Sequence, residues 1–161
     1  MKKIVIVTMV VAFVCFGFRS YAQEELDKIQ KEWGKEKKEL VRLGMGLNTA
    51  DSVKFWPVYS KYEKERQKLG KERILILDDY ANHYADLTNP KADELVNKIF
   101  KNDLALSRLQ QQYYTTMKTT LNARSAAKFL QIEIYINNVI RTLVQEEIPF
   151  IDELEEMKKS M

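Results

Sequence analysis

Histidine and cysteine are scarce in this chain, and its abundant acids are not spaced as a catalytic set. His83 is the one histidine, and Cys15, the one cysteine, lies in an apolar leader. Adjacent acids such as Asp78 and Asp79 point apart on a helix, so they are poorly placed to share a substrate. We interpret His83 as a structural or surface residue and the acids as solvated charge, and we predict that the protein is not an enzyme.

The chain also lacks the residues that metal binding and phosphate binding require. Transition-metal sites draw on histidine, cysteine and clustered carboxylates, whereas the chain after its leader offers one histidine, no cysteine and scattered methionines. The sequence contains no glycine-rich phosphate loop. We therefore predict no metal site and no cofactor.

Aromatic side chains are the more informative group. Most of them are expected to form the seam between helices, but a thin hairpin cannot bury two faces of every helix. An amphipathic tyrosine can face water or a partner at modest cost. Arginines among the apolar positions suggest either a mixed surface that holds other chains or salt bridges between helices. The candidate partner-binding residues are Trp56, Tyr59, Tyr62, Arg66, Arg73, Tyr80, Tyr84, Tyr113 and Tyr114.

Helices are predicted to position these side chains, because glycine and proline are scarce and apolar residues recur three and four apart. A first helix is expected over residues 24–43 and should end at Gly44 and Gly46. Its predicted apolar stripe is Leu26, Ile29, Trp33, Leu40 and Leu43.

Two similar stretches, LNTADSVKFW (47–56) and LNARSAAKFL (121–130), predict two helix starts. Asn48 and Asn122 can each accept a hydrogen bond from a free amide of the first turn. Phe55 and Phe129 should then point into the core. The repeat is thus interpreted as architecture rather than chemistry.

The helix after Asn48 is expected to span about residues 49–87, with Pro57 kinking or restarting it. The stretch 87–90 is predicted to end it, with Asn89 as the next cap and Pro90 at the first helical position. Further helices are expected over 90–119 and 123–147, and Pro149 should begin a final turn or short helix. The predicted fold is all-α, an elongated antiparallel helical hairpin or an open four-helix bundle.

Residues 1–22 resemble a signal peptide, with Lys2 and Lys3 ahead of an apolar run and small residues near its end. Cleavage is expected before Gln23, with a retained anchor as the alternative. Residues 23–161 would then form a single all-helical domain. The protein is expected to be exported to the periplasm.

Charge balance argues against nucleic-acid binding. The whole chain has 26 basic and 23 acidic residues. Lys2, Lys3 and Arg19 leave with the leader, so the mature chain carries 23 of each sign. Nucleic-acid binding requires clustered positive charge, and we predict no such partner.

Two leucine-led helix entrances, a long helix pair and a signal peptide make the chain resemble the Spy/CpxP-like periplasmic proteins, whose repeated signature is LTxxQ. Here LNTAD and LNARS lack both the threonine and the glutamine of that signature. The stretches FWPVYSKYEKERQ and QQYYTTMKTTLNARSAAKFLQIE are similar to small exported Bacteroidetes proteins labelled sensor of ECF-type sigma factor. The resemblance covers roughly residues 40–145.

This resemblance implies an all-helical, often dimeric protein that holds unfolded clients or reports envelope stress, and a homodimer is expected. Two functional hypotheses follow from it. The first is an ATP-independent holdase-type chaperone for unfolded or partly folded envelope proteins, probed by client aggregation. The second is a stress sensor or regulator that acts on a membrane-anchored signalling partner.

Overall fold

The computed structural model describes residues 36–145 and residue 148, and its regular elements are all helical. Residues 36–45 are helical, and they are followed by α3 (Thr49–His83) and the 3-10 turn η1 (Tyr84–Asp86). The chain then forms α4 (Asn89–Thr120) and α5 (Ala123–Gln145). The predicted all-α fold is therefore confirmed for the described part of the chain.

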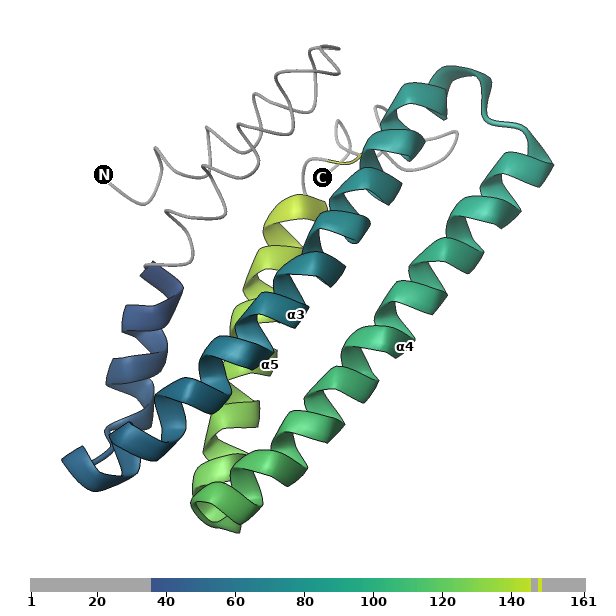
Figure 1. Ribbon diagram of the computed structural model, residues 1–161. Helices are drawn as coiled ribbons and strands as arrows, with labels where there is room; N and C mark the ends of the chain where they lie inside the picture. The colour runs from purple at the N-terminus through teal and green to yellow at the C-terminus, as the bar shows by residue number, and fades with distance from the viewer. Residues whose placement is uncertain (1–35, 146–147, 149–161) are drawn as a thin grey trace, which may run out of the picture.

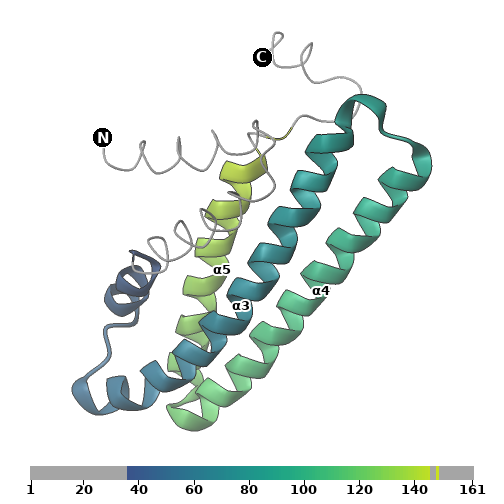
Figure 2. The ribbon, with the colours of Figure 1, turned by 45° about the horizontal axis from the view of Figure 1, so that its top comes forward.

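The two longest helices, α3 and α4, form an extended antiparallel hairpin, and α5 runs back along α4 (Figures 1 and 2). Helix 36–45 lies beside the N-terminal end of α3. With the usual rise of an α-helix, α3 extends over about 52 Å. The predicted signal peptide, residues 24–35 of the first predicted helix, residues 146–147 and the turn after Pro149 lie outside the described residues.

Both repeated entrances begin helices as predicted. Asn48 Oδ1 accepts a hydrogen bond from the Asp51 amide at 2.8 Å, and Asn122 Oδ1 accepts one from the Ser125 amide at 2.9 Å. Each asparagine thus satisfies one of the amides that a first helical turn leaves without a partner. The phenylalanine that follows each cap is buried, as expected.

The predicted cap of α4 is wrong by one residue. Thr88, not Asn89, has the extended backbone of a cap, and its Oγ1 accepts from the Lys91 amide at 3.4 Å. Asn89 is the first residue of the helix. Pro90 follows it within the first turn, where its missing amide costs no helical hydrogen bond.

Pro57 was predicted to kink or to restart the helix, and a restart is wrong, because α3 continues through it. A proline nitrogen cannot donate to the carbonyl four residues earlier, here that of Val53. Val53 and Pro57 are both exposed, so water can serve that carbonyl. The expected second helix ends earlier than predicted, at His83 instead of residue 87, with η1 filling part of the difference.

Helix 36–45 buries a different face from the one predicted. Its exposed side carries Leu40 and Leu43, which are 51% and 61% exposed, although both belong to the predicted apolar stripe. The buried side chains are Lys37, Val41 and Met45, which follow one another at four-residue spacing. The helix ends where the Gly46 amide donates to the Arg42 carbonyl at 3.2 Å.

The core is an aromatic cluster at the N-terminal half of α3. Phe55, Tyr59 and Tyr62 project from successive turns of α3, and the ring of Phe129 from α5 meets all three edge-on. Tyr113 from α4 packs edge-on against Tyr62 with ring centroids 5.3 Å apart. The aliphatic and sulfur-containing core residues around these rings are Val41, Met45, Leu109, Met117, Ala126 and Ile136.

Candidate functional site

A buried charge cluster lies beside the aromatic core and joins three helices. Lys37 Nζ donates to Glu63 Oε2 of α3 at 2.6 Å and to Glu133 Oε2 of α5 at 2.8 Å. Tyr62 Oη donates to the same Glu133 oxygen at 2.9 Å, and Arg66 holds Glu63 through two hydrogen bonds. The cluster therefore pairs two cations with two carboxylates and ties helix 36–45 to both α3 and α5.

Burial and charge act in opposite directions on the carboxylate of Glu63. Burial alone would raise its pKa, but the hydrogen bonds and positive charges of Arg66 and Lys37 outweigh burial and hold the pKa below its ordinary value. Burial, followed by the negative charge of Glu133, raises the pKa of Tyr62 far above its usual range. Both groups therefore keep their ordinary charge at neutral pH, with Glu63 ionised and Tyr62 protonated.

Glu133 depends strongly on its cationic partner. The residue is fully buried, and its Oε1 accepts no hydrogen bond from the described residues. Its other oxygen receives Lys37 and Tyr62. A buried carboxylate that loses its cation is strongly destabilising, so Lys37 is the residue that compensates the charge of Glu133 in the core.

This cluster was not predicted from the sequence, although a signal was present. Glu133 lies four residues after Phe129 and three before Ile136, inside the apolar stripe of α5. Lys37 lies four residues before Val41 on the buried face of its helix. A charged residue at an apolar position of each stripe is the pattern expected of a buried ion pair.

Three of the predicted partner-binding tyrosines are not available at the surface. Tyr59, Tyr62 and Tyr113 are buried, because their rings form the aromatic core. Tyr113 also donates to Glu65 Oε1 at 2.6 Å. The prediction that these three residues bind a partner at the surface is therefore wrong, because they belong to the core.

The two predicted arginines take part in ion pairs instead of facing a partner freely. Arg66 belongs to the buried charge cluster. Arg73 of α3 pairs with Asp103 of α4 at 2.7 Å, and Arg141 of α5 contacts the same carboxylate. Asp103 thus connects α4 to α3 and to α5 through two ion pairs. Salt bridges between helices were the alternative predicted for these arginines.

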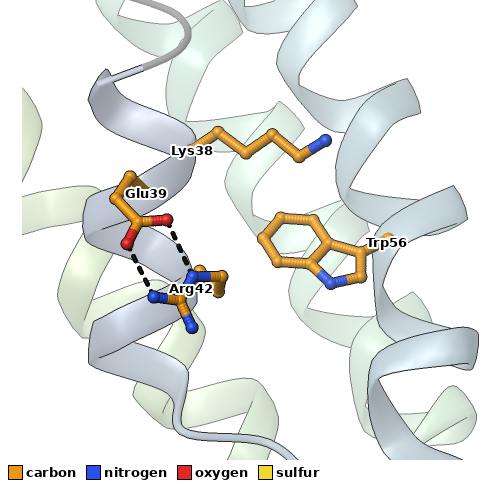
Figure 3. A pocket seen from close by; sticks show the side chains of 4 residues that line it. All are labelled: Lys38, Glu39, Arg42 and Trp56. Carbon is orange, nitrogen blue, oxygen red and sulfur yellow. Dashed lines mark hydrogen bonds and ion pairs between the residues drawn. The ribbon is translucent and has the colours of Figure 1, made fainter. Parts of the chain in front are cut away.

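The remaining predicted aromatic residues, Trp56, Tyr80, Tyr84 and Tyr114, are partly exposed. The rings of Tyr80 and Tyr84 pack edge-on at the distal end of α3, with centroids 5.9 Å apart. Trp56 lines an open pocket of about 320 Å³ between α3 and helix 36–45 (Figure 3). Of the predicted set, these four can contribute to a surface.

Figure 3 shows the Trp56 pocket with its three charged neighbours. Lys38 Nζ lies 5.2 Å from the centre of the indole ring, within the range of a cation–π contact. Glu39 and Arg42 pair with each other on the same helix at 2.6 Å. The pocket offers an aromatic wall framed by both signs of charge.

Helix α4 carries an exposed stripe of aliphatic and aromatic side chains that were not predicted to bind a partner. Val96, Phe100 and Leu104 follow one another at four-residue spacing, so they share one face of the helix. They are 45%, 66% and 52% exposed. The buried residues of α4, such as Leu95 and Leu109, lie on its other side, and we call the exposed set the α4 apolar stripe.

The described residues contain no group of three or more histidine, cysteine, aspartate or glutamate side chains arranged to hold a metal. Among the same residues, no helix is both long and apolar enough to cross a membrane. His83 lies on the surface with its Nδ1 2.8 Å from the Asp79 carbonyl, as a surface histidine would.

No protein-family model, curated protein or solved structure matches the chain.

Proposed function

We propose that this protein is a non-enzymatic periplasmic protein that binds exposed segments of other proteins as an ATP-independent holdase-type chaperone of the envelope stress response. The observation that carries the proposal is the α4 apolar stripe. Contiguous exposed apolar surface of this kind is uncommon on a protein that interacts with nothing. The resemblance to Spy/CpxP-like proteins supports the same function, and a homodimer is part of the proposal.

The surroundings of the stripe suit weak and repeated binding. Lys101 and Arg108 are exposed on α4 near the stripe, as is Asp93. Apolar contacts would hold a client, while charges of both signs would attract segments of varied sequence without fixing one register. No energy source is needed for binding of this kind, because release follows from its weakness.

A more discrete feature favours a second candidate function. The Trp56 pocket presents one aromatic wall with Lys38 beside it, which suits a single side chain of one defined partner. An envelope stress sensor or regulator that acts on a membrane-anchored signalling protein would use such a pocket. Trp56→Ala should then abolish capture of that one partner and leave general client binding intact.

The direct test of the holdase proposal is the aggregation of several unrelated unfolded clients in the presence of the mature protein. Stoichiometric protein should delay aggregation of all of them without nucleotide. Phe100→Gln should weaken the protection, whereas Leu75→Gln, at a comparably exposed position on α3, should leave it nearly intact. Unchanged aggregation of every client in the presence of the unmutated protein would refute the proposal.

A further inference from the structure

Helix 36–45 lies against both α3 and α5, and we call the surface that it covers on these two helices the groove. Its Lys37 reaches carboxylates on both helices, and its Met45 carbonyl accepts a hydrogen bond from Lys128 Nζ of α5 at 3.0 Å. Gly44 lies so close to α5 that a Cβ there would be 2.8 Å from Ile132 Cδ1. The helix is therefore held along one face by a cation and two apolar side chains at four-residue spacing.

The other side of the same helix is held weakly. Leu40 and Leu43 are exposed, and the ion pair between Glu39 and Arg42 lies within the helix, so it anchors the helix to nothing else. The link to α3 is the short stretch 46–48, in which Gly46 has a φ of 57°. For the helix to leave while the three long helices stay packed, the described contacts that must break are those of Lys37, Val41 and Met45, the Lys128 hydrogen bond and the Lys38 contact with Trp56.

The groove without its helix would favour a positive charge. Glu63 would keep Arg66, but Glu133 would keep only the hydroxyl of Tyr62 among the partners described. Burying a carboxylate without a cation is unfavourable. An incoming segment that supplies a cation at the position of Lys37 would therefore bind better than a purely apolar one.

We propose that the groove between α3 and α5 is a binding site for helical segments of other proteins, and that helix 36–45 is its resident competitor. The segment it fits presents a lysine or arginine followed by aliphatic side chains four and eight residues later, as Lys37, Val41 and Met45 do. This inference rests on the proposed function, since it names one class of segment that the protein would bind. The fraction of molecules with the helix displaced sets the apparent affinity.

A reversible lock on helix 36–45 tests this directly in the full chain. In a Cys15→Ser background, the pair Gly44→Cys and Ile132→Cys places two thiols in contact, and the second change removes the atom that a Cβ at position 44 would strike. Oxidation would hold the helix in the groove, and reduction would free it. The same protein is thus its own control.

The probe is a fluorescein-labelled helical peptide with lysine, valine and methionine in the register of Lys37, Val41 and Met45 and alanine or glutamine elsewhere. A matched peptide carries norleucine in place of lysine. The reduced protein should bind the lysine peptide at least about tenfold more tightly than the norleucine peptide, and oxidation should abolish binding. Equal affinities for the two peptides, or binding that oxidation does not change, would overturn the inference.

Lys37→Met supplies a second, independent measurement. It removes the cation of the resident helix and keeps its length, so the lysine peptide should bind about tenfold more tightly than it binds the unmutated protein. No gain in affinity would count against the inference. If light scattering shows that Lys37→Met forms dimers through the groove, the occupant is a second copy of this chain, and the assignment to other proteins is wrong.

The client-aggregation assay separates this inference from the holdase proposal. The oxidised double-cysteine protein should still protect clients through the α4 apolar stripe. If protection persists while neither peptide binds selectively, only the groove inference fails. If the lysine peptide binds selectively and no client is protected, the holdase proposal fails and the groove remains.

Discussion

The two halves of the molecule differ in how far they bury their apolar side chains. The proximal half, formed by helix 36–45, the N-terminal half of α3 and the helices packed on it, encloses the aromatic core and the charge cluster. In the distal half, residues 70–104, only Ile76, Leu95 and Asn102 are buried. Exposed there are Ile74, Leu75, Val96, Phe100 and Leu104.

This contrast separates folding from the proposed binding. The proximal half has enough enclosed apolar surface to hold the helices together, since buried aromatic side chains contribute most to such cores. The distal half leaves several apolar side chains of α3 and α4 in water. Substitutions in the aromatic core should therefore affect stability, and substitutions in the α4 apolar stripe should affect client binding.

The largest expected difference is between two phenylalanines. Phe129→Ala removes the ring that meets three others in the core, and it should lower the free energy of unfolding by about 3–5 kcal/mol. Phe100→Ala should leave the free energy of unfolding nearly unchanged, because that side chain is mostly in water. Urea unfolding followed by circular dichroism measures both. Equal losses would show that the distal half is as well packed as the proximal half.

Acid should weaken the proximal half through Glu63. Its pKa is lowered in the folded protein, so the stabilisation is present above the unfolded value of about 4.3 and is lost as the pH falls through the lower folded value. The free energy of unfolding should thus decrease below about pH 5. Glu63→Gln should flatten this decrease in urea titrations at several pH values. A variant with the unchanged acid profile would place the sensitivity elsewhere.

The helix caps should give a smaller and graded effect. Asn48→Ala and Asn122→Ala each remove a side-chain acceptor from a first turn, and each should cost about 1 kcal/mol. Asn89→Ala should cost only a small fraction of that, since Thr88 holds the cap position of α4. Thermal unfolding compares the three variants. A loss for Asn89→Ala that matched the other two would restore Asn89 as a cap.

The smallest effect is expected at the distal ion pairs. Asp79 contacts Lys91 at 2.9 Å and Lys98 at 3.3 Å, all with side chains partly in water. Asp79→Asn should cost at most about 1 kcal/mol, and added salt should remove the difference. Unfolding in low and high sodium chloride tests this. A loss that persisted in high salt would indicate that these charges are less hydrated than their exposure suggests.

Much of the fold could be predicted because local signals agreed. Helical periodicity placed α3, α4 and α5 within a few residues of their observed ends, and Asn48 and Asn122 marked two starts correctly. Ile132, Ile134 and Ile136 alternate in sequence as residues of a strand would, but they lie in α5, where the surrounding residues have helical spacing. These features depend on residues close together in sequence.

The errors arose where distant residues decide the outcome. Leu40 and Leu43 fit a helical stripe, yet the helix turns its lysine-bearing face inward because Glu63 and Glu133 lie in the groove. Periodicity cannot distinguish these faces when the inner one carries a lysine. The exposed stripe of α4 was missed for a related reason. Apolar residues occur on both sides of that helix, and only packing shows which side is covered.

Site-specific crosslinking tests the central claim most directly. A benzophenone side chain placed at Phe100 should crosslink unfolded clients on illumination. The same group placed at the exposed residue Lys64 of α3 should give little crosslinking. Equal crosslinking from both positions, or none from position 100 while aggregation is still suppressed, would contradict the assignment of client binding to the α4 apolar stripe.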